Sequence, residues 1–244
     1  MQKKRLDSMV VDKGLAKSRQ RARSLIMAGH VLVNGVPVDK PGTAVTGLEQ
    51  ISVRGEDHPY VSRGGIKLEA ALRAFALDVH GNVCLDVGAS TGGFTDCLLH
   101  HGASRVFAVD VGYGQLAWKL RQDPRVVVIE RTNIRHMARE TITEPVDLVT
   151  IDVSFISLRL VVPAVVPHVK PTGGIVALVK PQFEAGKGRV GKGGVVRDPA
   201  LREEIVRGVM ETFIQNGFDC SEAEPSPIRG PKGNQEYFIY LRLL

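Results

Sequence analysis

The chain has 244 residues, of which 43% are hydrophobic and 24% charged, and this composition excludes collagen-like and disordered proteins. Its net charge of +6 is concentrated at one end, because residues 1–30 hold eight basic and two acidic residues and the rest of the chain holds 24 of each. A basic segment on a neutral body predicts either a polyanionic partner or a solvated basic tail.

Cysteine spacing and hydropathy limit the cellular setting. Cys84, Cys97 and Cys220 lie far apart and form no CxxC or Cys/His cluster, so we expect neither a disulfide framework nor a metal site. The most apolar stretch, residues 160–166, is interrupted by Pro163 and is too short to span a bilayer. The basic start lacks the apolar run of a secretory signal. We therefore expect a cytoplasmic protein without a membrane partner.

The first sixty residues predict a small α+β domain, with the boundary at residue 60. Apolar residues spaced along 6–15 share one helical face, and Ser18 is a candidate N-cap for a second helix. Residues 31–33 and 36–38 flank Asn-Gly and predict a hairpin, and residues 51–53 predict another strand. The second helix carries its basic residues away from the apolar face: Lys17, Arg19, Arg21 and Arg23.

This first segment resembles the alpha-L RNA-binding module of a small-subunit ribosomal protein and of pseudouridine synthases. The resemblance is carried by Ser18-Arg19, Ala22, Leu25-Ile26, Gly29, Val31, Val33 and Asn34-Gly35. It implies a basic helix face on an RNA backbone, where Lys and Arg side chains displace counterions. The candidate RNA-binding residues are Lys17, Arg19, Arg21 and Arg23, together with Arg63 from the following segment.

From residue 61 to residue 244, short β-branched runs alternate with helical segments, which predicts a mostly parallel, doubly wound α/β sheet. A helix is expected near residues 199–216, followed by two final strands. Core packing is the expected role of Tyr113 and Trp118. The predicted strands are 83–87, 106–109, 126–129, 148–151, 175–179, 218–223 and 237–244.

A glycine-rich turn, residues 85–95, follows the first of these strands and opens a helix. Its GxxxGG spacing differs from the dinucleotide fingerprint GxGxxG, and it lacks the lysine of a P-loop. Residues 186–193 nearly match a P-loop but lack its Ser/Thr, so this basic stretch predicts an RNA-facing or flexible loop. Asp110 ends the second strand, where it can accept both hydroxyls of a ribose. A nucleoside-plus-amino-acid cofactor is therefore a third interpretation, and a turn without a ligand is the alternative.

The order strand, DxGxxxGG, strand, acid resembles the S-adenosylmethionine-dependent methyltransferases of the Rossmann-like class. The resemblance implies that glycines of the turn line the methionine side of the cofactor. It also implies that Asn133-Ile134 meet the adenine, where members of the class often have an acid. The implied cofactor-binding residues are Asp86, Gly88, Ser90, Gly92, Gly93, Phe94, Asp110, Asn133 and Ile134.

Four charged residues stand at or beside predicted strand ends. Asp152 and Lys180 end the fourth and fifth strands, so both project at the carboxyl edge of the sheet, where ligands bind. Lys67 opens the helix before the first strand, and Glu236 joins the others if the last strand runs antiparallel. Each residue taken alone is also consistent with a surface salt bridge.

This Lys–Asp–Lys–Glu order resembles the FtsJ-type ribose 2'-O-methyltransferases. With the first module added, the chain resembles the TlyA, or hemolysin-A-like, family, which implies methylation of cytidine 2'-hydroxyls in ribosomal RNA or ribosomal subunits. A neutral lysine can act as a general base, and we expect Lys180 in that role, oriented by Asp152. Lys67 is expected to disfavour the charged form of Lys180 or to hold the ribose or phosphate, and Glu236 to hold a lysine or the ribose. Two alternatives stay open: a non-catalytic RNA-binding protein on this fold, and a membrane-active hemolysin.

Overall fold

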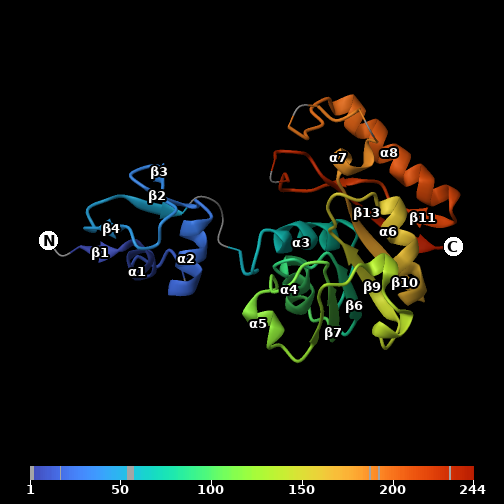
Figure 1. Cartoon of the computed structure of the whole chain (residues 1–244), viewed down its shortest axis with the longest axis horizontal. Coiled ribbons are helices and arrows are strands. Elements are labelled where there is room, and N and C mark those ends of the chain that lie inside the picture. Colours follow the sequence, from blue (N-terminus) through green and yellow to red (C-terminus); the bar gives the residue numbers. More distant parts are fainter. Residues whose placement is uncertain (1–2, 17, 54–57, 187, 192, 231) are drawn as a thin grey trace. The chain divides into compact units, whose positions relative to one another are not determined.

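The computed structural model describes residues 3–16, 18–53, 58–186, 188–191, 193–230 and 232–244. The chain divides into two compact units, Met1–Pro59 and Tyr60–Leu244, each with its own apolar core. Figure 1 labels most of the helices and strands of both.

The first unit is built on two short helices and short strand pairs. Ser18 caps the second helix as expected, because its hydroxyl accepts the N–H of Arg21 at 3.2 Å. The hairpin turn at Asn34-Gly35 is also present, with positive φ at both residues. The elements are α1 (Leu6–Asp12), α2 (Arg19–Met27), a sheet of β3 (Val36–Pro37), β2 (Val31–Val33) and β5 (Ile51–Val53), and a pair of β1 (Lys4–Arg5) with β4 (Ala44–Val45).

The second unit is organised around a sheet with the strand order β11-β13-β10-β9-β6-β7-β8, and β12 pairs with β13. Strands β6 to β10 are parallel to one another, whereas β13 runs antiparallel to β10. The predicted mostly parallel sheet with an antiparallel last strand is therefore confirmed. The strands are β6 (Val83–Val87), β7 (Arg105–Val109), β8 (Val126–Ile129), β9 (Val146–Ile151), β10 (Val169–Val179), β11 (Phe218–Cys220), β12 (Glu224–Pro225) and β13 (Tyr237–Leu243).

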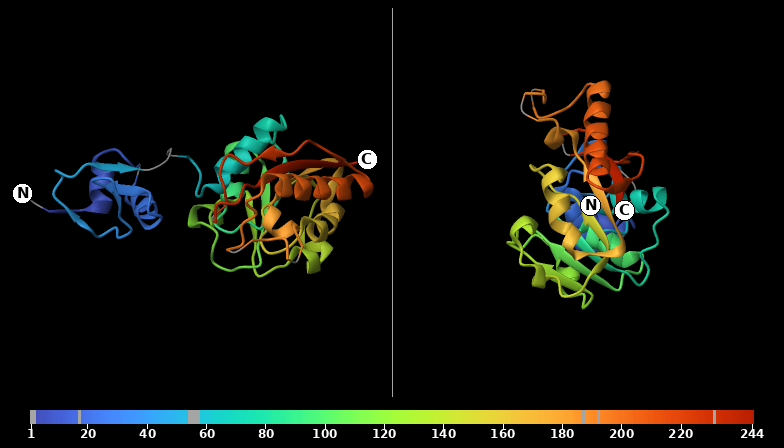
Figure 2. Two further views of the ribbon diagram at one scale, coloured as in Figure 1. Left: turned by 90° about the horizontal axis from the view of Figure 1, so that it is seen from above. Right: turned by 90° about the vertical axis from the view of Figure 1, so that its right-hand side faces the viewer.

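Helices cover both faces of this sheet. One face packs against α3, α4 and α5, and the other against α6 and α8. In the left view of Figure 2, α3 (teal) and α8 (orange) lie on opposite sides of β13 (red). The helices are α3 (Gly64–Ala74), α4 (Gly93–His100), α5 (Trp118–Arg121), α6 (Leu158–Val165), α7 (Pro181–Glu184) and α8 (Pro199–Gln215), with 3-10 turns η1 (Ile134–His136), η2 (Arg139–Thr141) and η3 (Val166–His168).

Two details differ from the sequence predictions. Strand β10 begins at Val169 rather than at residue 175, because an irregularity between Val169 and Gly174 accommodates a stretch that has the composition of a turn. Tyr113 and Trp118 are 66% and 68% exposed, so their predicted core packing is wrong. Both lie in the segment after β7, in which Leu116 and Leu120 are the residues that pack into the core.

Strand register gathers the charged residues at one edge. Ile151 of β9 pairs with Ala177 of β10, and Val179 of β10 pairs with Tyr237 of β13. Lys180 therefore leaves β10 where Glu236 enters the antiparallel β13, and Asp152 leaves β9 next to them.

Candidate active site

The four predicted catalytic side chains form two ion pairs. Lys180 Nζ lies 2.6 Å from Asp152 Oδ1, and it donates a hydrogen bond to Ser154 Oγ at 3.0 Å. Lys67 Nζ donates to Glu236 Oε2 at 2.5 Å. Glu236 is only 1% exposed and both lysines are 8% exposed. Lysines this buried need a charged partner, and in each pair the carboxylate supplies it.

Strand topology explains which acid meets which lysine. Asp152 and Lys180 follow adjacent parallel strands, whereas Lys67 lies in the first turn of α3 and meets the entry to β13. The sequence predicted Asp152 beside Lys180, and it left open whether Glu236 holds a lysine or a ribose. In the structure Glu236 contacts Lys67.

An exposed aromatic residue that the sequence motifs did not single out stands beside the Asp152–Lys180 pair. Phe155 is 88% exposed and has a φ of +65°, a backbone conformation that is costly for a bulky residue. Its ring centroid lies 4.9 Å from that of Phe183, in α7 just after Lys180. An exposed aromatic ring, held at this edge by a strained backbone, is a surface on which a nucleobase can stack. The available signal was an aromatic residue three positions after the strand-end acid.

The glycine-rich turn approaches the catalytic edge closely. Gly88 has a φ of +86°, and a Cβ there would lie 2.6 Å from the carbonyl oxygen of Asp152. Gly92 has a φ of +93°, and a Cβ there would lie 2.3 Å from Leu120 Cδ1. Both positions need glycine for backbone conformation and for space. The turn therefore lies directly against the residue that pairs with Lys180.

Replacing Gly88 by alanine is expected to destabilise the protein by roughly 1–3 kcal/mol beyond the strain of a positive φ, because the new methyl group meets backbone. Gly81→Ala is the matched control, since Gly81 has a φ of +74° and nothing lies within 4 Å of the place that its new methyl group would take. Urea unfolding of both variants measures the difference. Equal losses of stability in the two would contradict the close approach.

Asp110 joins the turn after β6 to the segment after β7. Its Oδ2 accepts the N–H of Ser90 at 2.8 Å, and its Oδ1 accepts the N–H of Gly112 at 2.6 Å. A half-buried carboxylate at this position, beside glycines that admit a ligand to the backbone, fits the nucleoside of a cofactor. Gly93 completes the turn and packs against α3.

The remaining predicted cofactor residues have structural partners. Asn133 caps η1, where its Oδ1 accepts the N–H of Arg135 at 3.1 Å, and Ile134 is 7% exposed. Phe94 is 3% exposed and packs near Phe238, with ring centroids 6.1 Å apart.

Asp86 is fully buried, so its carboxylate is enclosed by protein. Thr95 Oγ1 donates to its Oδ2 at 2.6 Å, and Thr150 Oγ1 donates to its Oδ1 at 3.1 Å. Burial raises the pKa of Asp86 to about 7, although both threonine hydrogen bonds oppose the shift. In this structure the side chain supports the turn from below and does not reach its surface.

The pKa of Asp86 makes a stability prediction. Between its ordinary pKa of 3.8 and the folded value of about 7, the folded protein holds a proton that the unfolded chain has lost. The stabilisation is thus fully present below the lower value and is lost as the pH rises through the higher one. Relative to Asp86→Asn, the wild-type free energy of unfolding should fall by up to roughly 4 kcal/mol across this window. Urea unfolding at pH 4, 5.5 and 8 tests this, and a constant difference would count against it.

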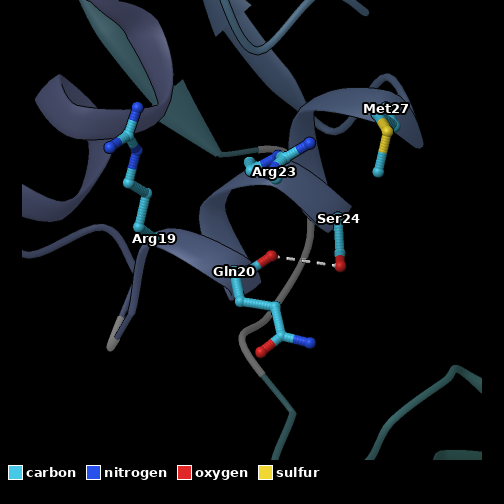
Figure 3. Close-up of a pocket in the computed structure, with 5 residues that line it drawn as sticks. All are labelled: Arg19, Gln20, Arg23, Ser24 and Met27. Carbon is cyan, nitrogen blue, oxygen red and sulfur yellow. Dashed lines mark hydrogen bonds between the residues drawn. The ribbon is translucent and has the colours of Figure 1, made fainter. Parts of the chain in front are cut away.

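Three of the predicted RNA-binding residues, Arg19, Arg21 and Arg23, lie on α2. Arg19, Gln20, Arg23, Ser24 and Met27 line an open pocket on this helix (Figure 3). Arg19 also lies 3.3 Å from the buried carboxylate of Asp7. Hydrogen bonding from Arg5 is the main cause that lowers the pKa of Asp7 to about 2.

The other candidate RNA contacts have different surroundings. Arg23 is exposed and Arg21 is half-buried, whereas Lys17 lies outside the described residues. Arg63 is exposed and belongs to the second unit, where it precedes α3. Lys187 and Lys192, in the basic stretch at residues 186–193, also lie outside the described residues.

The described part of the chain offers neither a metal cluster nor a membrane span. Within the ranges given above, no group of three or more His, Cys, Asp or Glu side chains is placed to hold a metal ion. In the same ranges, no helix is long and apolar enough to cross a membrane.

Strand order, glycine-rich turn and strand-end acids together define a Rossmann-type methyltransferase domain. The sequence pattern of FtsJ-like methyltransferases matches residues 60–243, and that of the S4 domain matches residues 4–51. The chain belongs to the TlyA family, in which an S4 domain precedes an FtsJ-like methyltransferase domain.

Individual relatives span almost the whole chain. The 16S/23S rRNA (cytidine-2'-O)-methyltransferase TlyA of Mycobacterium tuberculosis is 53% identical, over 98% of this chain and 89% of its own. Hemolysin A of Brachyspira hyodysenteriae is 44% identical, over 97% and 98% of the two chains. A solved structure of a hemolysin-named protein from Streptococcus thermophilus has a TM-score of 0.77 at 43% identity and covers 99% of this chain and 88% of that one.

Proposed function

We propose that this protein transfers a methyl group from S-adenosylmethionine to the 2'-hydroxyl of a cytidine in ribosomal RNA. The observation that carries the proposal is the pair of buried lysine–carboxylate contacts, Lys180–Asp152 and Lys67–Glu236, beside the glycine-rich turn. The name of the 53% identical relative supports the substrate. The match to the S4 domain supports binding to RNA.

The reaction needs a weak nucleophile to be positioned and its proton to be removed. S-adenosylmethionine supplies a methyl group on a sulfonium, which leaves as a neutral thioether. The Lys180 ammonium, paired with Asp152, first gives one proton to solvent. The resulting neutral amine accepts the proton of the 2'-hydroxyl as the hydroxyl oxygen forms the new bond to the methyl carbon. Asp152 and Ser154 hold the Lys180 amine in place, and Glu236 holds Lys67 where it can contact the ribose or phosphate.

Residues of the glycine-rich turn would hold the cofactor. Asp110 would accept hydrogen bonds from the ribose of the cofactor, and the turn from Gly88 to Gly93 would contact its methionine part. Asn133 and Ile134 would border the adenine. Asp86 supports the turn from inside the sheet, because its carboxylate is engaged by Thr95 and Thr150.

The direct test is methyl transfer by purified protein. Tritiated S-adenosylmethionine is incubated with deproteinised ribosomal RNA and with ribosomal subunits, and reverse-transcription stops at low dNTP locate the product. Incorporation at a ribose is the expected result. The hemolysin names of relatives make liposome leakage the necessary comparison, and strong leakage independent of cofactor would instead favour a membrane-active protein. Cofactor and RNA binding without transfer would favour a non-catalytic RNA-binding protein.

Phe155 is expected to stack on the target base. Phe155→Ala should weaken productive RNA binding by roughly 1–3 kcal/mol, because stacking on an aromatic ring contributes about that much per base. Phe155→Tyr keeps the ring and serves as the control. KM for RNA, measured beside cofactor affinity, distinguishes this role from a general defect. An unchanged KM in Phe155→Ala would show that the ring does not contact the substrate.

A further inference from the structure

Two segments carry the Asp152–Lys180 pair, and further contacts join these segments in addition to that pair. Residues 152–157 connect β9 to α6, and Lys180 leads from β10 directly into α7. At the inner end, Lys180 contacts Asp152 and Ser154. Farther out, the rings of Phe155 and Phe183 are in contact.

The outermost tie is a buried carboxylate. Glu184, the last residue of α7, has a side chain that is 1% exposed. Its Oε2 accepts from Ser157 Oγ at 2.6 Å and from Arg159 Nη1 at 3.1 Å, and its Oε1 accepts the N–H of Leu158 at 2.7 Å. All three donors belong to the start of α6, where backbone N–H groups lack helical partners and a negative charge is favoured.

Helix α8 also contacts the group of residues that bind Glu184. Arg159 Nε donates to Thr212 Oγ1 at 3.0 Å, so the guanidinium bridges Glu184 and α8. A carboxylate with charged and backbone donors in a buried site has one well-defined geometry. Glu184 therefore ties α7, the helix that follows Lys180, to the start of α6 and, through Arg159, to α8.

We propose that Glu184 is a positioning residue for methyl transfer, which holds Lys180 against Asp152 and fixes the Phe155 loop beside them. Glu184 contacts neither the Lys180 amine nor Phe155 in the described hydrogen bonds and ring contacts. Glu184 acts on Lys180 through the four residues of α7 that follow that lysine. It acts on Phe155 through its hydrogen bond with Ser157, which lies two residues after Phe155. This inference rests on the proposed methyltransferase function.

Glu184→Gln tests the proposal, because the amide keeps the size of the side chain and removes the charge that faces Arg159. Displacement of a reacting group by about 1 Å can cost ~10²-fold in rate, so we expect kcat to fall by about that factor. Cofactor affinity, measured by calorimetry, should stay within roughly threefold, since Glu184 bonds to residues 157–159 and not to the glycine-rich turn. Ser157→Ala removes one donor and should lower kcat by roughly tenfold, the equivalent of one hydrogen bond to a charged group.

Asp147→Asn is the matched control. Asp147 also accepts a backbone N–H, that of Val83 at 2.9 Å, and pairs with Lys170 at 2.7 Å, but it lies at the opposite end of β9. A fall of kcat in Asp147→Asn equal to that in Glu184→Gln would assign both effects to general destabilisation and overturn the proposal. So would an unchanged kcat in both Glu184→Gln and Ser157→Ala.

Hydrogen exchange separates failure of this inference from failure of the proposed function. In Glu184→Gln, amides of residues 152–158 and 180–185 should exchange faster than in wild type, whereas those around residue 147 should not change. Unchanged exchange in both segments would exclude the positioning role. If the wild-type protein is inactive but the exchange pattern is as expected, the methyltransferase proposal is rejected. The role of Glu184 in holding the two segments together would still stand.

Discussion

Lys180→Ala is expected to lower the rate of methyl transfer by about 10²–10⁴-fold, the usual contribution of a positioned general base. The amine is held directly by Asp152 and Ser154, and alanine leaves no proton acceptor at that point. Cofactor affinity should change little, because the glycine-rich turn and Asp110 keep their contacts. Single-turnover transfer of tritiated methyl groups to RNA, with calorimetry of the cofactor, measures both quantities.

Lys170→Ala is the control for Lys180→Ala. Lys170 lies near the start of the same strand and pairs with Asp147 at 2.7 Å, so its replacement also removes a lysine–carboxylate pair from the sheet. We expect this variant to transfer methyl groups at the wild-type rate. Activity unchanged in Lys180→Ala would refute the assignment of the general base. An equal loss of the methyl-transfer rate in the two variants would show that the loss comes from reduced stability of the fold and not from a missing base.

Removing residues 1–59 is expected to weaken RNA binding and its dependence on salt, with cofactor affinity nearly intact. Residues 1–30 of the first unit hold eight basic and two acidic residues, and each phosphate interaction that the truncation removes should reduce the slope of log K against log salt by about 0.7–0.9. The cut leaves Tyr60, whose side chain is 3% exposed within the second unit. Filter binding at several salt concentrations, beside cofactor calorimetry, makes the measurement.

Arg23→Gln in the full chain refines this test. Arg23 is exposed on α2, whereas Arg19 also pairs with the buried Asp7, so a change at Arg23 removes a charge and leaves the Asp7 pair intact. The salt slope should fall by the equivalent of about one phosphate interaction. RNA binding by the shortened chain with the same affinity and slope as the full chain would rule out the first unit as the RNA-holding part.

Much of this architecture could be predicted because it follows from periodicity and strand ends. Alternating apolar runs and a Gly-rich turn predicted the parallel sheet, and residues directly after the strands predicted the catalytic edge. Two-residue strands such as Lys4–Arg5 carry no such pattern and were missed. The role of Glu184 was also hidden, because its three donors are 25 to 27 residues away and come together only through packing.

The pairing of Glu236 with Lys67 showed the limit of sequence reasoning in another way. The antiparallel direction of β13 decides whether Glu236 reaches the site, and no local pattern in residues 237–244 encodes direction. Strand direction depends on which neighbour pairs with the strand, here β10.

The Lys67–Glu236 contact joins residues 169 positions apart, from the first helix of the methyltransferase unit and the entrance to its last long strand. A ribosome that is still making this chain releases Lys67 long before Glu236 exists. The partners of the turn after β6, Asp110 and Asp152, are both made before β13, whereas the complete set of charged side chains cannot assemble until the final strand has emerged. Under the proposed function, activity requires that the whole domain has been made and folded, and a chain cut before β13 would carry the glycine-rich turn without the Glu236 partner of Lys67.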